Sequence, residues 1–80
     1  MAGSPIKLTR RLLSQSRVIA KGQHIRAVNR LVAQYGGKAS KWVKKSSPQL
    51  EIAGKKIEYH WYEHRGIGRF EIREVRINQP

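Results

Sequence analysis

The apolar positions of residues 23–35 repeat at helical spacing. They lie three or one positions apart, and polar side chains fill the positions between them; the apolar set is Ile25, Val28, Leu31, Val32 and Tyr35. This spacing predicts an amphipathic helix over 23–35. Gly36 and Gly37 follow directly, and one of them is expected to take the left-handed conformation that ends a helix.

Residues 5–20 carry a weaker form of the same pattern. Ser4 and Pro5 resemble an N-cap and a first helical position. The side chains that share one helical stripe after them are Leu8, Leu12, Gln15 and Ile19. We expect a helix from residue 5 to about residue 14 or 20, preceded by a linker at residues 1–4. Together with the helix over 23–35, this predicts that residues 5–36 are helical.

From residue 42 onward the pattern favours strands. Residues 56–63 alternate, with Ile57, Tyr59 and Trp61 on one face. A short strand at 50–52 and a tight turn at 53–55 precede them. The basic segment 38–47 is either a helical turn capped by Ser40 or a first strand, and Pro48 ends it.

Residues 69–77 form the last expected strand, and their apolar positions change phase. Phe70 and Ile72 are in phase with each other, whereas Val75 and Ile77 are not. The slip predicts a β-bulge or a change of face near residues 73–74. The order of elements predicts one α+β domain over residues 1–80, in which N-terminal helices pack on one face of an antiparallel β-meander formed by residues 42–77.

Charge is distributed unevenly along this chain. The sequence has 17 Lys and Arg against 5 Asp and Glu, a net charge of +12. Residues 1–50 hold eleven of the cations and no acid, and all five glutamates lie in residues 51–80. A block of like charges repels itself when folded, so we expect an anionic partner, and nucleic acid fits best.

Several kinds of site are excluded or disfavoured by composition. The chain has no cysteine, so disulfides, thiolate zinc sites and cysteine nucleophiles are excluded. It has no aspartate, which disfavours two-metal nuclease chemistry, and its three histidines fit no HExxH motif. No apolar run is long enough to span a membrane. We therefore expect no metal, no cofactor and no membrane contact.

The two long strands bring reactive side chains together. If Ile57, Tyr59, Trp61, Phe70 and Ile72 face the helices, the opposite face carries Glu58, His60, Tyr62, Arg69, Glu71 and Arg73. RNA cleavage without a metal needs a base for the 2′-hydroxyl, an acid for the leaving 5′-oxygen and cations for the phosphorane. Histidine, with a reference pKa of about 6.5, serves as either base or acid near neutral pH.

This reasoning assigns roles to particular residues. His60 is the expected base or acid and Tyr62 or Glu63 its partner, with arginines on the phosphate; the catalytic candidates are His60, Tyr62, Glu63, Arg65 and Arg69. The expected RNA-binding residues are Lys38, Lys41, Lys44, Lys45, Arg26, Arg30, His64 and Arg73. Glu71 is expected to pair across strands with Arg69 or Arg73, a role that stays open for Glu58, and the tryptophans are expected to lie in the core.

Two runs of sequence resemble a family. Residues 35–47 (YGGKASKWVKKSS) and 58–63 (EYHWYE) are similar to the C-terminal toxin domains of bacterial polymorphic toxins, and the resemblance covers residues 23–77. The motif residues are Gly36, Gly37 and Lys38 in the first run, and His60, Trp61, Tyr62 and Glu63 in the second. The absence of aspartate and the short length depart from many members of this family.

The resemblance implies a barnase/EndoU/colicin/RelE-like (BECR-like) ribonuclease fold, with N-terminal helices packed on an antiparallel sheet. Such domains are delivered from a producer cell by contact-dependent inhibition or related systems, and many cleave tRNA in the target-cell cytoplasm. Each is neutralised by a cognate immunity protein, often acidic. Active residues vary within the fold, so the fold alone does not identify them.

Three functions stay open. The first is a monomeric toxin domain that cleaves RNA, tRNA above all, to a 2′,3′-cyclic phosphate without a metal. The second is a non-catalytic RNA- or DNA-binding module, which explains the charge equally well but not the cluster of reactive side chains on one hairpin. The third is a DNase or a translation-blocking toxin of different chemistry, and a requirement for divalent metal would indicate the DNase.

Overall fold

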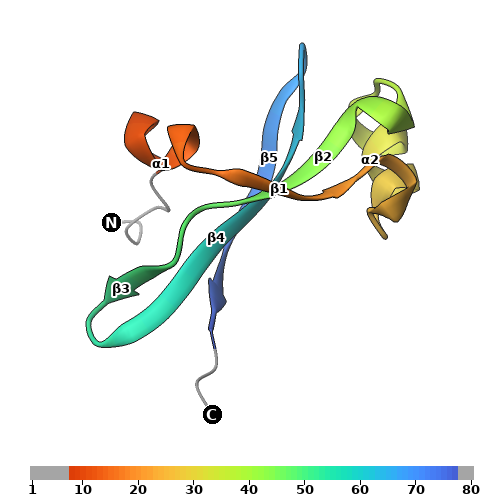
Figure 1. Ribbon diagram of the computed structural model, residues 1–80. Coiled ribbons are helices and arrows are strands. Elements are labelled where there is room, and N and C mark those ends of the chain that lie inside the picture. The colour runs from red at the N-terminus through yellow and green to blue at the C-terminus, as the bar shows by residue number, and fades with distance from the viewer. Residues whose placement is uncertain (1–7, 78–80) are drawn as a thin grey trace, which may run out of the picture.

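The computed structural model describes residues 8–77 of the 80-residue chain. Two short helices, α1 (Arg10–Ser14) and α2 (Val28–Tyr35), accompany five strands (Figure 1). The strands are β1 (Arg17–Lys21), β2 (Trp42–Ser46), β3 (Leu50–Ile52), β4 (Lys55–His64) and β5 (Gly68–Arg76). Single 3₁₀ turns at Gly22–His24 and Ala39–Lys41 precede α2 and β2.

All strand pairs are antiparallel, and β4 is the central strand. On one side β4 pairs with β2 along its C-terminal half and with β3 along its N-terminal half, and on the other side it pairs with β5. Strand β1 pairs with the outer side of β2. Segment 38–47 contains both a helical turn and strand β2, but Ser40 lies within the 3₁₀ turn and does not cap it, so the expected cap is wrong. The predicted break at Pro48, strand at 50–52 and α+β class with an antiparallel sheet are confirmed.

The helices cover opposite faces of the sheet, so the expectation that they share one face is wrong. On one face, buried Ile57, Tyr59 and Trp61 of β4 pack against leucines that include Leu12 and Leu13 of α1. On the other, α2 packs against Trp42, and Tyr62 of β4 joins that second core. Strand β1 separates the helices in the chain and lies at the edge of the sheet, which lets the chain pass from one face to the other (Figure 1).

The sequence pattern predicts helix throughout residues 5–36, and this prediction is wrong. Helix α1 is capped by the Thr9 hydroxyl, which accepts a hydrogen bond from the Leu12 amide at 3.1 Å, and it ends at Ser14. Residues 17–21 form β1 because Val18 and its neighbours pair with β2. Helix α2 begins at Val28 rather than at residue 23, and it ends at Gly36, whose φ is 91°. The proposed linker 1–4 and the start at Pro5 lie outside the described residues.

The expected bulge in the last strand occurs earlier than predicted. Tyr62 pairs with Phe70 and His60 pairs with Arg73, so two residues of β5 lie opposite Trp61. Glu71 is one of them, with a φ of 58°. The bulge reverses the side-chain alternation, so Phe70 packs in the α2 core while Ile72 packs in the α1 core. The expectation that Phe70 and Ile72 share a face is therefore wrong.

Contacts with α2 hold the bulge in place. Arg30 donates two hydrogen bonds to the Glu71 carboxylate, both at 2.8 Å, and the Tyr35 hydroxyl donates a third at 2.9 Å. These bonds, led by those from Arg30, hold the pKa of Glu71 below its ordinary value. The positive φ of a glutamate is strained, and the three bonds account for its persistence.

Candidate functional site

The sheet face that carries α2 extends beyond the residues that the helix covers. Helix α2 covers this face over Trp42 and Phe70. Beyond the helix, the strand registers place one residue from each of four strands in a row, because directly opposed residues project to the same face. Across β1, β2, β4 and β5 this row is Arg17, Ser46, His60 and Arg73. We call it the polar row.

His60 of the polar row forms an imidazole–carboxylate pair with Glu58. Glu58 and His60 lie two residues apart on β4 and so share its face, and His60 Nε2 is 3.0 Å from Glu58 Oε1. The same carboxylate oxygen accepts a hydrogen bond from the Ser46 hydroxyl at 3.1 Å, and Arg17 lies 3.5 Å from the other oxygen. Four groups from three strands are therefore linked through Glu58.

The electrostatics of the pair favour a charged carboxylate. The hydrogen bond to His60, aided by Ser46 and Arg17 and opposed by burial, lowers the pKa of Glu58 from its ordinary value. A carboxylate only accepts hydrogen bonds, so Glu58 selects the His60 tautomer that carries its proton on Nε2. In neutral His60 the basic atom is then Nδ1. The arrangement can accept a proton there and stabilise the resulting imidazolium.

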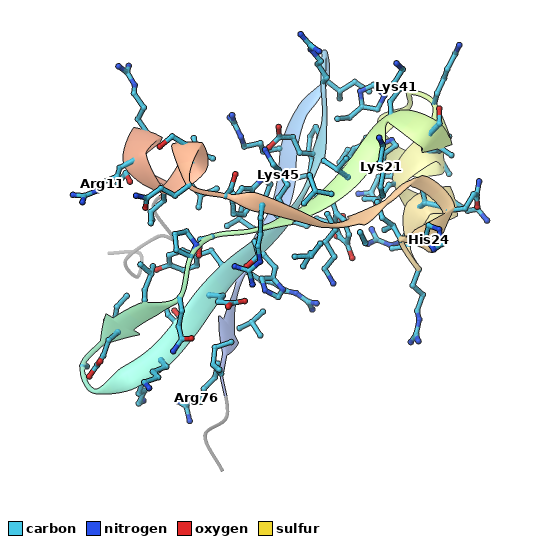
Figure 2. The ribbon with its side chains drawn as sticks, in the orientation of Figure 1. Arg11, Lys21, His24, Lys41, Lys45 and Arg76 are labelled. Carbon is cyan, nitrogen blue, oxygen red and sulfur yellow. The ribbon has the colours of Figure 1, made fainter. Side chains whose placement is uncertain are left out.

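A cleft adjoins the polar row at the end nearest α2. Its volume is ≈ 420 Å³, and it lies between the segment that leads into α2 and the sheet, lined by Ala20, His24, Ile25, Arg26, Ala27, Lys44, Tyr62 and Arg73. Arg73 belongs to both the cleft and the polar row. Lys44 pairs with Tyr62 across β2 and β4, and its Nζ lies 5.9 Å from the centre of the Tyr62 ring. Figure 2 shows His24 beside α2. We call this the basic cleft.

Two predicted catalytic residues lie on the opposite face. The Glu63 carboxylate accepts hydrogen bonds from Trp61 Nε1 at 3.0 Å and from Arg69 Nε at 3.2 Å, and Lys45 Nζ lies 3.6 Å away. The bulge at Glu71 places Arg69 on this side of the sheet. The expectation that Arg69 lies on the face of His60 is therefore wrong, and Glu63 orients the buried Trp61 instead.

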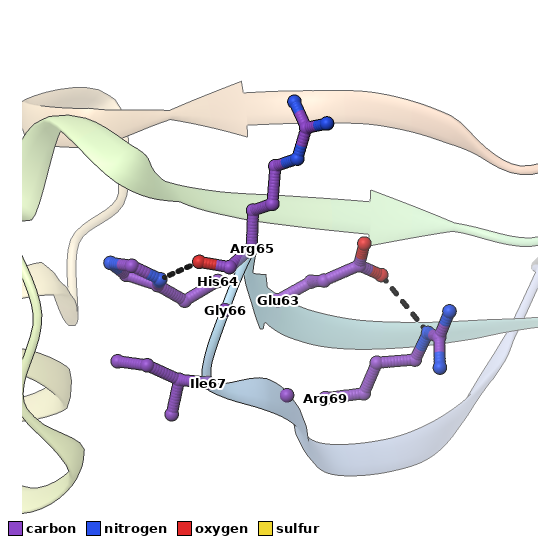
Figure 3. Close-up of a pocket in the computed structure, with 7 residues that line it drawn as sticks. Glu63, His64, Arg65, Gly66, Ile67 and Arg69 are labelled. Atoms are coloured by element: carbon purple, nitrogen blue, oxygen red, sulfur yellow. Dashed lines mark hydrogen bonds and ion pairs between the residues drawn. The ribbon is translucent and has the colours of Figure 1, made fainter.

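The β4–β5 hairpin end forms a second hollow, of ≈ 330 Å³, lined by residues 63–69. Figure 3 shows Glu63 extending toward Arg69 and away from His64. Arg65 lies exposed in the turn, away from His60. His64 Nδ1 lies 2.7 Å from the Arg65 carbonyl, its ring meets Trp42 edge-on, and its buried Nε2 has no partner in the described residues. One ring nitrogen of His64 is therefore engaged by the backbone and the other is buried, so its position favours a structural role.

The other predicted RNA-binding residues are divided between several surfaces. Arg26, Lys44 and Arg73 line the basic cleft. Arg30 is engaged by Glu71, and Lys45 lies near Glu63 on the opposite face. Lys38 and Lys41 are exposed at the 3₁₀ turn before β2, where Figure 2 labels Lys41.

Sequence reasoning missed four residues of this site. Glu58 was placed on the face of His60 but given no role there, although its two-residue spacing on an alternating strand brings the two side chains together. Arg17 and Ser46 join the site only through the β1–β2–β4 register. His24 enters through the turn that follows β1, and no sequence pattern signals these last three.

Searches against protein-family models, curated proteins and solved structures found no match to this chain. The functional argument therefore rests on the geometry of residues 8–77. In that part of the chain, no three His, Asp or Glu side chains are grouped to hold a metal ion. No helix among the same residues is long and apolar enough to cross a membrane.

Proposed function

We propose that this protein is a metal-independent endoribonuclease whose reactive centre is the His60–Glu58 pair. The observation that carries the proposal is the position of this pair, on the sheet face beyond α2 and between Arg17 on one side and Arg73 on the other. A base, a carboxylate that orients it and two phosphate-binding guanidiniums are the groups that cleavage at a 2′-hydroxyl requires.

The proposed reaction follows from the tautomer that Glu58 selects. His60 Nδ1 takes the proton of the 2′-hydroxyl, whose oxygen attacks the adjacent phosphorus. Arg73 and Arg17 stabilise the phosphorane, and the Tyr62 hydroxyl, on the same face, gives its proton to the leaving 5′-oxygen. The P–O5′ bond breaks, leaving a 2′,3′-cyclic phosphate on one fragment and a 5′-hydroxyl on the other. Glu63, on the far face, has no part in this reaction.

The proposed biological setting is that of an antibacterial toxin domain. The resemblance of residues 23–77 to polymorphic toxin domains supports it, as does the net charge of +12. In this setting the domain is delivered from a producer cell as part of a larger effector and cleaves tRNA in the target-cell cytoplasm. A cognate acidic immunity protein neutralises it, because complementary charge accelerates association and favours this partner.

A second candidate is a non-catalytic RNA-binding module. The specific observation in its favour is that the His60 and Glu58 side chains are only 16% and 14% exposed. Buried polar pairs often serve the fold alone, and the cations around the polar row would bind a phosphate backbone without any reaction.

The deciding experiment incubates the purified protein with total bacterial RNA in EDTA and resolves the products on a denaturing gel. We expect discrete fragments that end in cyclic phosphate. His60→Ala is expected to reduce the rate by about 10²–10⁴, the usual contribution of a general acid or base. Glu63→Gln is the matched control, since it removes a glutamate charge from the opposite face, and it is expected to retain cleavage.

Either of two results would favour the binding module. One is intact RNA together with a salt-sensitive shift on a native gel. The other is cleavage at the same rate in wild type and His60→Ala that disappears on further purification, which would identify a contaminant. Cleavage that persists at the wild-type rate in pure His60→Ala would instead overturn the assignment of His60. Loss of cleavage on addition of EDTA alone would indicate a metal-dependent nuclease instead.

A further inference from the structure

The basic cleft gathers positive charge that no acid of its own balances. Arg26, Lys44 and Arg73 line it, and no glutamate does. The two nearby glutamates are already engaged, Glu58 by His60 and Glu71 chiefly by Arg30. Like charges that converge without a counter-charge raise the energy of the folded chain, and a bound anion relieves this repulsion.

The rest of the lining is alkyl or aromatic, and its two aromatic side chains, His24 and Tyr62, also carry polar atoms. Ala20, Ile25 and Ala27 contribute alkyl surface, and the Tyr62 side chain contributes a ring that ends in a hydroxyl. The volume of ≈ 420 Å³ falls within the range of sites for small ligands. Alkyl surface beside converging cations suits a ligand with a flat, weakly polar part and an anionic part, which describes a nucleotide.

The hydrogen-bonding capacity of the cleft distinguishes between the bases. Its charged side chains carry donors only, since guanidinium and ammonium groups accept nothing. Guanine presents two adjacent acceptors, O6 and N7, which one arginine binds together. Adenine and cytosine place an amino donor on the corresponding edge, where it would face a cation.

We propose that the basic cleft is a nucleotide subsite selective for guanine, with one guanidinium on the O6/N7 edge and the remaining cations on the phosphate. Arg26 and Arg73 are the two arginines that line it, from the segment before α2 and from β5. Because Arg73 is paired with His60, the bound guanosine lies next to the reactive centre. The position next to a reactive centre rests on the proposed ribonuclease function, whereas the binding of a nucleotide in the basic cleft does not.

The test measures binding of 3′-GMP, 3′-CMP, 3′-AMP and inorganic phosphate to the full chain by isothermal titration calorimetry at low salt. We expect 3′-GMP to bind roughly 5- to 100-fold more tightly than 3′-CMP or 3′-AMP, the range for one bidentate arginine–guanine contact. Arg26→Ala is expected to remove this preference.

The matched control is Arg76→Ala. It removes an exposed arginine near the end of β5, remote from His24 and the cleft, as Figure 2 shows. This variant is expected to keep the preference for 3′-GMP. Circular dichroism on both variants checks that each is folded, and Arg26→Lys tests the bidentate contact, because a lysine keeps the charge but loses the fork.

Three results would overturn the subsite. The four ligands binding alike would indicate a phosphate site without base selection. A preference for 3′-GMP that Arg26→Ala and Arg73→Ala both retain would place the base elsewhere. No binding of 3′-GMP at all would remove the site.

The ribonuclease proposal fails separately from the subsite. If 3′-GMP binds selectively but RNA stays intact, the subsite proposal is supported and the ribonuclease proposal is wrong. If RNA is cut with no preference for guanosine and 3′-GMP does not compete, the nuclease stands and the subsite falls. His60→Ala is expected to keep the preference for 3′-GMP over 3′-CMP and 3′-AMP while failing to cleave RNA, which separates base selection from catalysis.

Discussion

Replacing Gly37 by alanine tests whether His64 has a structural rather than an RNA-binding role. Gly37 has a φ of 81°, and a Cβ built on it would lie 2.4 Å from His64 Nε2 and 2.8 Å from Ile67 Cδ1. No real Cβ tolerates such distances, so the His64 ring must shift. That ring lies edge-on against Trp42, with centroids 5.2 Å apart, and Trp42 is fully buried in the α2 core.

Gly36→Ala is the matched control for this perturbation. Gly36 also has a positive φ, 91°, but a Cβ there would meet nothing within 4 Å. Both variants place an alanine at a positive φ, which strains the backbone by about 1–3 kcal/mol. Only Gly37→Ala also overpacks the ring, which typically costs a further 1–3 kcal/mol. The difference between the two variants therefore isolates the contact with His64.

The assay is urea denaturation followed by tryptophan fluorescence. We expect Gly37→Ala to lower the free energy of unfolding by about 1–3 kcal/mol more than Gly36→Ala does, or by roughly 4–20 °C in Tm for a domain of this size. Equal loss of stability in the two variants would refute the reasoning, because it would show that His64 is not seated against Gly37.

Three further predictions concern stability and binding. Ala53 has a φ of 52° in the β3–β4 turn, so Ala53→Gly is expected to raise Tm by relieving about 1 kcal/mol of left-handed strain, and a lower Tm by calorimetry would contradict this. Hydrogen bonds led by those from Arg30 lower the pKa of Glu71. Their contribution to the free energy of unfolding is therefore complete above the unfolded pKa and is lost as pH falls through the folded value. Glu71→Gln should flatten the decline of stability below pH ~4.5, and an unchanged acid transition would count against the contact. Lys44→Ala should reduce the salt dependence of RNA binding by about one unit of the logarithmic slope, whereas a slope equal to that of wild type would place Lys44 away from the phosphates.

The parts of the fold that sequence predicted best are those determined locally. Helix α2 follows from the spacing of Val28 and Leu31 and from the glycines after Tyr35, and the β3–β4 hairpin follows from alternation around a two-residue turn. Strand β1 was misread because its apolar residues also fit a helical stripe. Val18 and Ile19 are 52% and 40% exposed, so only pairing with β2 identifies this segment as a strand.

The site was predicted less well than the fold because its geometry depends on contacts distant in sequence. The phase slip in β5 was visible, but its position is determined by Glu71, whose partners Arg30 and Tyr35 lie 41 and 36 residues away. That bulge decides on which face Arg69 lies. His60 was identified from its residue type. The partner of Glu58 stayed open, since pairing with His60 and pairing with an arginine across the strands both fit an alternating strand.

The uneven charge of the chain has a structural explanation. Three of the five glutamates are used to hold the structure together: Glu58 binds His60 and Ser46, Glu63 binds Trp61 and Arg69, and Glu71 binds Arg30 and Tyr35. All three lie on the β4–β5 hairpin, the part of the chain that both helices pack against.

The acid-free half of the chain supplies cations to this hairpin in excess of what it can pair. Arg17, Arg30 and Lys45 find carboxylates there, whereas Arg26 and Lys44 line the basic cleft without one. One carboxylate in that cleft would relieve the repulsion between these cations. A cleft that no glutamate lines and that adjoins the polar row of His60 is suited to an external anion. This suitability connects the net positive charge of the sequence with the proposed RNA substrate.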